Sequence, residues 1–364
     1  MVVPFRIKNS KKIRKNLKRK ERRKMKKLHA NYGKEILEKQ QNIDILQNKM
    51  ESVNNELIMS KALSKKPNLV ASSSFINCKQ IIATGPCLSK SSKDSKKKLG
   101  QLLPGIPRFK NADIEILYEG ICIGKGQFGQ IKLVKLNRLN TVVACKEMSK
   151  MSSRNDVLGE VITGLTVSGE KYFPFTYGML NENAILMEYF GDLGELNPKS
   201  APSLYEHFKD SACSKKEFTS VLVGVLNGVI ALHGFKILHN DLKADNFICA
   251  KDCVKVIDFG KATIFSYPKT YNIVPGSELA DKYNKYHRHL AYELRNIPGS
   301  KQSILTDTYS VGFMFKHLGA KVGCKEMISL GKHMKNKDPG SRVSLNNALN
   351  ICRKVNITLG KSFV

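Results

Sequence analysis

Two carboxylates and an amide lie close together in the second half of the chain. Asp241 and Asn246 belong to the run His-Asn-Asp-Leu-Lys-Ala-Asp-Asn at 239–246, and Asp258 follows after a short apolar stretch. A carboxylate can accept the proton of a hydroxyl group, while a second carboxylate and an amide oxygen are hard ligands of the kind that Mg²⁺ prefers. These residue types at this spacing indicate phosphoryl transfer, in which magnesium bridges the phosphates of a nucleotide.

Phosphoryl transfer also needs a loop that covers the phosphates and a lysine that grips them, and both precede these residues. The three glycines of the segment 124–129 lie between two predicted strands, 116–123 and 130–135. Glycine lets a hairpin turn bring backbone N–H groups close to phosphate oxygens, where a Cβ would block the approach. Seventeen residues after the last glycine, Lys146 ends an apolar, β-branched strand that begins at residue 142. Its ammonium would reach the α and β phosphates.

These elements, in this order, resemble the signature of the eukaryotic protein kinase family over about residues 113 to 355. The resemblance implies an α+β, two-lobed kinase fold at 113–358, with a small β-rich lobe at 113–187, a hinge at 188–194 and a large helical lobe at 195–358. It also implies an ATP-dependent protein serine/threonine kinase that transfers the γ-phosphate of Mg·ATP to Ser or Thr hydroxyls of protein substrates.

The resemblance assigns roles to four polar residues in the second half of the chain. Asp241 matches the catalytic base, and Lys243 resembles the lysine that contacts the transferring phosphate in Ser/Thr kinases. Asn246 and Asp258 match the two ligands of the magnesium ions. All four residues are present in the chain. An active enzyme is therefore favoured over a catalytically inactive scaffold, although both readings stay open.

The resemblance also assigns the nucleotide site in the first lobe. Lys146 matches the strand lysine, and Glu160 on the following helix matches its ion-pair partner, with Glu170 as a weaker candidate. Met187 stands where the family limits access behind the adenine. The implied nucleotide-binding residues are Gly124, Gly126, Gln127, Phe128, Gly129, Ile131, Ala144, Lys146, Met187, Glu188 and Ile248.

The catalytic loop is the run at 239–246 that contains Asp241, and the activation segment is the stretch from Asp258 to Glu293. Three further residues match family positions that support these two segments. Glu293, in Ala-Tyr-Glu at 291–293, resembles the glutamate that closes the activation segment, and Arg342 resembles its arginine partner. Asp307 matches an acid that braces the backbone of the catalytic loop. The segment 221–233, which is apolar, is predicted to be a buried helix leading into that loop, because it is shorter than a membrane span.

Two positions depart from the family pattern. Tyr292 replaces the usual proline, which removes the basis for inferring peptide specificity from the loop around it. Asn240 replaces the arginine that normally pairs with a phosphate on the activation segment, and an amide carries no charge for such a pair. We therefore hypothesise that activity does not depend on phosphorylation through this contact, despite candidate hydroxyls at Thr263, Ser266, Thr270 and Ser277.

The charge of the chain is concentrated before the kinase-like region. The 364 residues carry a net charge of +30, of which residues 1–110, with 28 Lys and Arg against 7 Asp and Glu, hold +21. We expect a basic helical and short coiled-coil extension at 1–60, in which Ile36, Ile43, Met50 and Leu57 recur every seven residues, and a flexible linker at 61–112.

The basic run at 6–27 is open to several readings. It is typical of a nuclear address, of contact with nucleic acid or another polyanion, or of a surface that meets acidic membranes, and a solvated tail is the plainest alternative. The coiled-coil repeat suggests self-association. A nucleic-acid-associated protein acting through this extension is thus an alternative function. Nine scattered cysteines without zinc-site spacing, and no leader or transmembrane segment, favour an intracellular protein, nuclear or otherwise cytoplasmic.

Overall fold

The structure is a computed structural model that describes most of the chain after residue 104, namely residues 105–126, 129–149, 154–194, 198–209, 213–251 and 253–361. The predicted basic helix and coiled coil at 1–60 and most of the predicted linker lie outside the described residues. So do Gln127 and Phe128 of the glycine loop.

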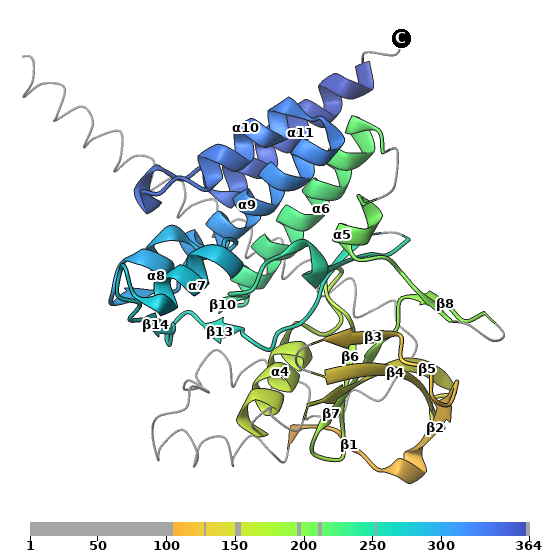
Figure 1. Ribbon diagram of the computed structural model, residues 1–364. Helices are drawn as coiled ribbons and strands as arrows, with labels where there is room; N and C mark the ends of the chain where they lie inside the picture. The colour runs from red at the N-terminus through yellow and green to blue at the C-terminus, as the bar shows by residue number, and fades with distance from the viewer. Residues whose placement is uncertain are drawn as a thin grey trace, which may run out of the picture. The chain divides into compact units, whose positions relative to one another are not determined.

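A curled sheet and one helix form the first lobe (Figure 1). The strand order is β1-β6-β7-β5-β4-β2, and β3 pairs with β4. Apolar residues of α4 (Arg154–Val167) pack onto the sheet around Met148, Met179 and Ile185. The strands are β1 (Arg108–Phe109), β2 (Ile114–Leu117), β3 (Gly124–Gly126), β4 (Gly129–Leu136), β5 (Thr141–Met148), β6 (Thr176–Leu180) and β7 (Ala184–Glu188).

The sheet differs from the sequence prediction at its first strands. The predicted linker ran to residue 112, but β1 pairs with β6 and Ile106 is buried beside α4. Two residues of strand after a Gly- and Pro-containing stretch are too short to show periodicity, which is why the sequence did not reveal them. The predicted strand 116–123 is also interrupted, because Tyr118 and Gly120 have φ of +55° and +78° and turn the chain between β2 and β3.

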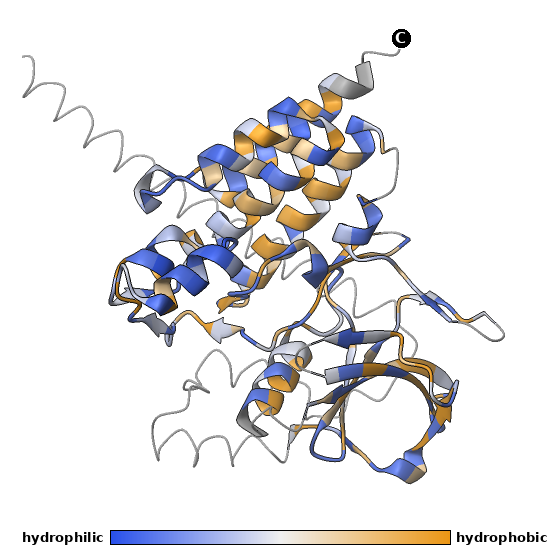
Figure 2. Ribbon diagram, in the orientation of Figure 1, coloured by the Kyte–Doolittle hydropathy of each residue, from blue (hydrophilic) through white to orange (hydrophobic). Residues whose placement is uncertain are grey.

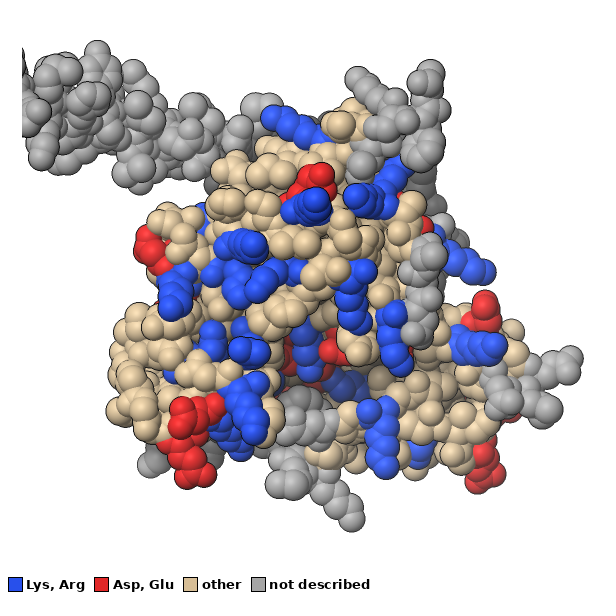
Figure 3. Space-filling view, turned by 45° about the horizontal axis from the view of Figure 1, so that its top comes forward, with Lys and Arg blue, Asp and Glu red and all other residues tan. Residues whose placement is uncertain are grey.

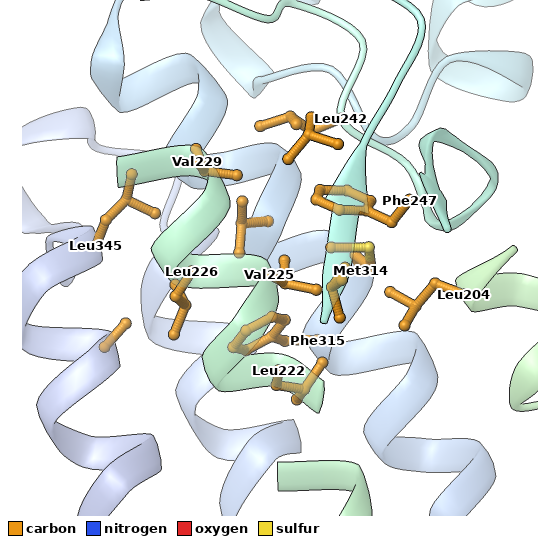
Figure 4. Packing of buried hydrophobic residues seen from close by; sticks show 14 of the residues in the cluster. Leu204, Leu222, Val225, Leu226, Val229, Leu242, Phe247, Met314, Phe315 and Leu345 are labelled. Atoms are coloured by element: carbon orange, nitrogen blue, oxygen red, sulfur yellow. The ribbon is translucent and has the colours of Figure 1, made fainter. Parts of the chain in front are cut away.

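The second lobe is built on four long helices, α6, α9, α10 and α11, so the predicted two-lobed kinase fold is confirmed. Side chains of α6 at positions three and four residues apart face α9 and α11, which is the spacing of a buried helix stripe (Figure 4). The helices are α5 (Leu204–His207), α6 (Lys215–Gly234), α7 (Glu278–Tyr286), α8 (Tyr292–Asn296), α9 (Ile304–Val322), α10 (Lys325–Met334) and α11 (Leu345–Lys361).

Helices α9 and α10 approach closely because each carries a glycine at the crossing. A Cβ added to Gly312 would lie 2.5 Å from the Cβ of Met334, and one added to Gly331 would lie 2.5 Å from the backbone nitrogen of Lys316. Both distances are shorter than real Cβ contacts, so neither position admits a side chain without moving a helix.

Helix α6 is the single helix of the described residues that is long and apolar enough to cross a membrane. It runs for 20 residues, so the prediction from sequence that this segment is too short for a span was wrong on length. Its buried residues nevertheless include Leu222, Val225, Leu226 and Val229, which lie in the core of the second lobe. The colouring by hydropathy shows apolar faces turned between the long helices (Figure 2). The predicted buried helix is confirmed.

Short two-stranded sheets connect the loops of the second lobe. Two of them, β10 with β13 and β14 with β15, hold the segment after Asp258 against the rest of the lobe. Their bounds are β8 (Gly191–Asp192), β9 (Lys199–Ser200), β10 (Ile237–Leu238), β11 (Phe247–Cys249), β12 (Val254–Val256), β13 (Thr263–Ile264), β14 (Thr270–Tyr271) and β15 (Ser300–Lys301).

A buried ion pair ties α8 to the loop before α11, as the sequence predicted. The guanidinium of Arg342 donates two hydrogen bonds, of 2.8 and 2.6 Å, to the carboxylate of Glu293. It also donates to the carbonyl oxygens of Leu305 and Asn336. Every arm of the guanidinium is therefore satisfied inside the lobe, which is what a buried charge requires.

We expect Arg342→Ala to lower the free energy of unfolding by about 3–5 kcal/mol, because it leaves Glu293 charged, buried and unpaired. Urea unfolding followed by circular dichroism measures the change. The control is Arg353→Ala, which removes an exposed arginine of α11 and should change the free energy of unfolding little. Equal effects of the two substitutions would contradict the stabilising role of the pair.

Candidate active site

Lys146 lies at the centre of an ionic cluster that joins three parts of the chain. Its Nζ is 2.5 Å from Oε1 of Glu160 on α4 and 3.0 Å from Oδ1 of Asp258 in the second lobe. Only 9% of Lys146 is exposed. Burial acts to lower the pKa of Lys146, but the ion pairs with Glu160 and then Asp258 outweigh burial and raise it. Glu160, and not Glu170, is thus the partner of the strand lysine.

The predicted nucleotide-binding residues of the sheet share one face. Ile131 of β4 is directly opposite Lys146 of β5, and Ala144 of β5 is directly opposite Met187 of β7. Residues opposite each other, and residues two apart along a strand, point to the same side of a sheet. Ile131, Ala144 and Met187 therefore form an apolar surface on the same side as the lysine ammonium.

Two further predicted nucleotide-binding residues lie outside this surface. Glu188 ends β7, and its carboxylate accepts a hydrogen bond of 3.0 Å from the backbone N–H of Phe175, so its side chain is engaged within the first lobe. Ile248 is in β11 of the second lobe, two residues after Asn246, and forms an isolated bridge with Ser203. The role of Ile248 in nucleotide binding stays a prediction.

The glycine loop forms a strand pair in which Gly124 is opposite Ile131 and Gly126 is opposite Gly129. The requirement for glycine at 129 differs from the one predicted. Gly129 has φ of +150°, and a Cβ there would lie 1.9 Å from the carbonyl oxygen of Glu147 on β5. Close approach of β4 to β5 therefore demands this glycine whether or not a phosphate is bound. At Gly126 a Cβ would meet nothing within 4 Å.

Asp241 is buried, and its carboxylate contacts two side chains that the sequence analysis did not identify. Nε2 of His289 is 3.1 Å from its Oδ1, and Nζ of Lys261 is 3.2 Å from its Oδ2. The predicted neighbour Lys243 lies farther away, at 3.7 Å. Burial acts to raise the pKa of Asp241, but the hydrogen bond from His289 and the charges of Lys261 and Lys243 hold that pKa well below its usual range.

Asp307 of α9 holds the backbone of the catalytic loop, as predicted. Its carboxylate accepts hydrogen bonds from the backbone N–H groups of His239, at 2.9 Å, and Asn240, at 3.0 Å. Nε2 of His233, on α6, lies 2.9 Å from the same carboxylate. The two backbone N–H groups thus hold the loop at residues 239 and 240, while the contact with His233 joins Asp307 to α6. The position of Asp241 follows from this anchoring.

Asn240 links the catalytic loop to the segment after Asp258. Its Nδ2 donates hydrogen bonds to the carbonyl oxygen of Lys261, at 3.0 Å, and to Oγ1 of Thr263, at 2.9 Å. Asn240 itself has φ of +65°, a left-handed conformation that asparagine tolerates better than most residues. An uncharged amide thus makes a direct connection at the position where the family usually has an arginine.

The predicted magnesium ligands supply a donor set that fits the ion. Nδ2 of Asn246 donates a hydrogen bond of 2.8 Å to the backbone oxygen of Asp241, which turns the amide oxygen away from that contact. The ion pair with Lys146 outweighs burial and lowers the pKa of Asp258, so its carboxylate is ionised. Mg²⁺ is usually held by one or two carboxylates together with substrate phosphates rather than by a closed protein cage. A carboxylate and an amide oxygen match that pattern.

Comparison with known proteins places these features in one class. The family model described as the protein kinase domain matches residues 119–324, more than half of the chain. The chain therefore belongs to the protein kinase family. It is 32% identical over 168 residues to calcium-dependent protein kinase 22 of Arabidopsis thaliana, a match that covers 43% of this chain and 33% of that protein.

Two other relatives match at similar levels of identity. The chain is 27% identical over 166 residues to the serine/threonine-protein kinase Tao of Drosophila melanogaster, covering 43% of this chain and 15% of that protein. It is 29% identical over 168 residues to the nitrogen permease reactivator protein of Saccharomyces cerevisiae, covering 43% and 20%. The matched regions thus span a third or less of the length of these three relatives.

The environment of Asp241 predicts how its charge contributes to stability at different pH values. A carboxylate whose pKa is lowered on folding stabilises the native state above its unfolded pKa, about 3.9, and this stabilisation is lost as the pH falls toward the folded value. We expect the melting temperature of the wild type to exceed that of Asp241→Asn by a constant margin from about pH 8 to 5, and by less below about pH 4.

Thermal unfolding in matched buffers measures this margin, with Asp281→Asn, an exposed carboxylate of α7, as the control. The control should melt close to the wild type throughout. A margin for Asp241→Asn that widened as the pH fell would show that its neighbours do not stabilise the carboxylate.

Proposed function

We propose that the protein is an active Ser/Thr protein kinase that transfers the γ-phosphate of Mg·ATP to hydroxyl groups of proteins. The observation that carries this proposal is the cluster of Lys146, Glu160 and Asp258, in which the strand lysine is already paired across both lobes. Lys243, two residues after Asp241, supports Ser and Thr as acceptors, and so do the relatives named as serine/threonine kinases.

The residues of the chain divide the work between binding and proton transfer. Lys146 would hold the α and β phosphates, and Asn246 and Asp258 would hold magnesium, which supplies charge neutralisation on the phosphates when bound. Asp241 would orient the acceptor hydroxyl and take its proton. The bond between the γ-phosphorus and the oxygen that bridges it to the β-phosphate breaks, a bond from the acceptor oxygen to that phosphorus forms, and ADP leaves.

We propose further that the conformation of the activation segment does not depend on its phosphorylation. Asn240 already connects the catalytic loop to Lys261 and Thr263 without a phosphate. The side chain of Gln302 accepts hydrogen bonds from the backbone of Lys269 and from Thr263. Ser277 caps α7 and accepts from the N–H of Ala280. Two of the four candidate hydroxyls, those of Thr263 and Ser277, are thus occupied by structural hydrogen bonds.

The direct test is transfer of labelled γ-phosphate from Mg·ATP to one acidic and one basic acceptor protein and to the chain itself. We expect label on Ser or Thr, and a loss of about 10²–10⁴-fold in Asp241→Asn, because that variant lacks the base. Asp258→Asn should also abolish transfer, and Asp281→Asn should not. Label on Tyr would overturn the acceptor specificity.

The same assay separates the kinase from an inactive scaffold. No transfer by the wild type, together with a rise in melting temperature on adding ATP and Mg²⁺, would favour a nucleotide-binding scaffold. The basic residues before 105 would then be the place to look for function.

Independence from phosphorylation is tested by treating the purified protein with a phosphatase. We expect phosphate transfer by the treated protein to equal that of the untreated protein, because Asn240 offers no charge to a phosphate. The double variant Ser266→Ala/Thr270→Ala, which removes the two exposed candidate hydroxyls, should be equally active. Loss of activity on treatment, with recovery when one activation-segment residue is phosphorylated again, would refute the hypothesis.

A further inference from the structure

The segment between Asp258 and α9 presents far more positive than negative charge to solvent. Among residues 259–303, all of which the structure describes, only Glu278 and Asp281 are exposed acids. Glu293 and Arg295 are buried, and Glu293 is paired with Arg342. The exposed cations are Lys261, Lys269, Lys282, Lys285, Arg288 and Lys301.

The order of charges along α7 places the positive end next to Asp241. Glu278 and Asp281 are in the first turn of the helix, where acids complement its dipole, and Lys285 is in the last turn. The chain then continues through Arg288 to His289, whose ring contacts the carboxylate of Asp241. A backbone contact fixes this loop, because Ser310 of α9 donates a hydrogen bond of 2.8 Å to the carbonyl oxygen of His289.

The cations around this loop lie close enough to act on one another. The pKa of Lys335 is lowered, chiefly by burial and in addition by the positive charges of Lys316, Arg295 and Arg288. His287, whose ring centroid is 6.2 Å from that of His289, is likewise buried in part and faces positive charge from Lys261 and Lys282. Like charges held together repel, and an anionic ligand relieves that repulsion.

A space-filling view shows that positive side chains gather on one face of the molecule (Figure 3). Lys and Arg side chains surround a hollow near the centre of the view, with acidic side chains visible in its depth (Figure 3). Arg288 adjoins His289, whose ring contacts Asp241, and Lys282 and Lys285 precede it on α7. An extended chain advances about 3.3–3.6 Å per residue. We therefore expect residues one to three positions from an acceptor hydroxyl at Asp241 to approach these cations.

We propose that the protein selects acceptor segments that carry negative charge within about three residues of the phosphorylated hydroxyl. The proposal rests on the proposed kinase function and names its substrate class. The recognised group is an anion, which is either the carboxylate of Asp or Glu or the phosphate of a residue phosphorylated beforehand. Lys282, Lys285 and Arg288 determine this specificity by attracting the acceptor, and they take no part in proton transfer.

The test uses the full chain and peptides with one Ser in an otherwise neutral background. The three residues on each side are Ala in the first peptide, Glu in the second and Lys in the third, and a fourth peptide carries one phosphoserine. We expect kcat/KM for the Glu or the phosphoserine peptide to exceed that for the Ala peptide at least about tenfold, and to fall as salt is added. The Lys peptide should be the poorest substrate.

A triple variant locates the selectivity. Lys282→Ala/Lys285→Ala/Arg288→Ala should lose most of the preference for negative charge while phosphorylating the Ala peptide as fast as the wild type does. The matched control is Lys325→Ala/Arg353→Ala/Lys354→Ala, which removes the same charges from exposed positions on α10 and α11. This control should keep the preference. The Glu and phosphoserine peptides tell the two sources of the anion apart.

Several outcomes would overturn the proposal. A preference for the Lys or Ala peptide would do so. A preference for the Glu peptide that survives in the triple variant would also do so, because the preference would then arise elsewhere in this basic chain. Tighter binding of a single-stranded RNA oligomer than of the Glu peptide, weakened by the same three substitutions, would assign the surface to RNA.

A binding measurement separates this proposal from the proposed function. Fluorescence anisotropy of a labelled Glu peptide with Ala in place of Ser needs no catalysis. If no peptide is phosphorylated but this peptide binds the wild type and the control at least about tenfold more tightly than the triple variant Lys282→Ala/Lys285→Ala/Arg288→Ala, the kinase function fails and the anion-binding surface stands. Equal binding by all three proteins refutes the surface.

Discussion

The buried ammonium of Lys146 is the interaction on which the arrangement of both lobes depends. A charged group taken out of water is stable only when opposite charges surround it at close range. Glu160 supplies one of these charges from α4 and Asp258 supplies the other from the second lobe. Strand β5, helix α4 and the segment that holds Asp258 must therefore be correctly placed relative to one another for the charge of Lys146 to be balanced. The geometry needed for nucleotide binding is thus also a condition for a stable lysine.

The second constraint is that Asp241 is held as an anion. A base that is to take a proton from a hydroxyl must be ionised. The hydrogen bond from His289 and the charges of Lys261 and Lys243 favour the ionised carboxylate. The same contacts lower the proton affinity of the carboxylate, which favours a role in orienting the hydroxyl until bonding to phosphorus is advanced. Asp307 fixes the loop through the backbone N–H groups of His239 and Asn240, which precede Asp241 in the chain.

The sequence predicted the residues that belong to motifs with a recognisable type and spacing. Lys146 and Glu160 were paired correctly, and the supports Asp307 and Arg342 contact the groups expected of them. The contact of Lys146 with Asp258 was not predicted. His289 and Lys261 were missed, because they reach Asp241 through the path of the chain between Asp258 and α9, and a histidine in a basic, aromatic stretch carries no spacing signal. The short strand β1 escaped for a similar reason, since two residues cannot show a period.

The residue at position 240 determines whether the activation segment needs an anion to hold it against the catalytic loop. An arginine at position 240 would bring a positive charge under the activation segment and would need an anion, such as a phosphate, to balance it. Asn240 instead hydrogen-bonds to Lys261 and Thr263, so the segment is fastened without an internal anion. The proposed independence from phosphorylation and the proposed preference for anionic acceptors are therefore compatible. The exposed cations of this segment need no internal phosphate to hold it in place, and they can attract an anion on the substrate instead.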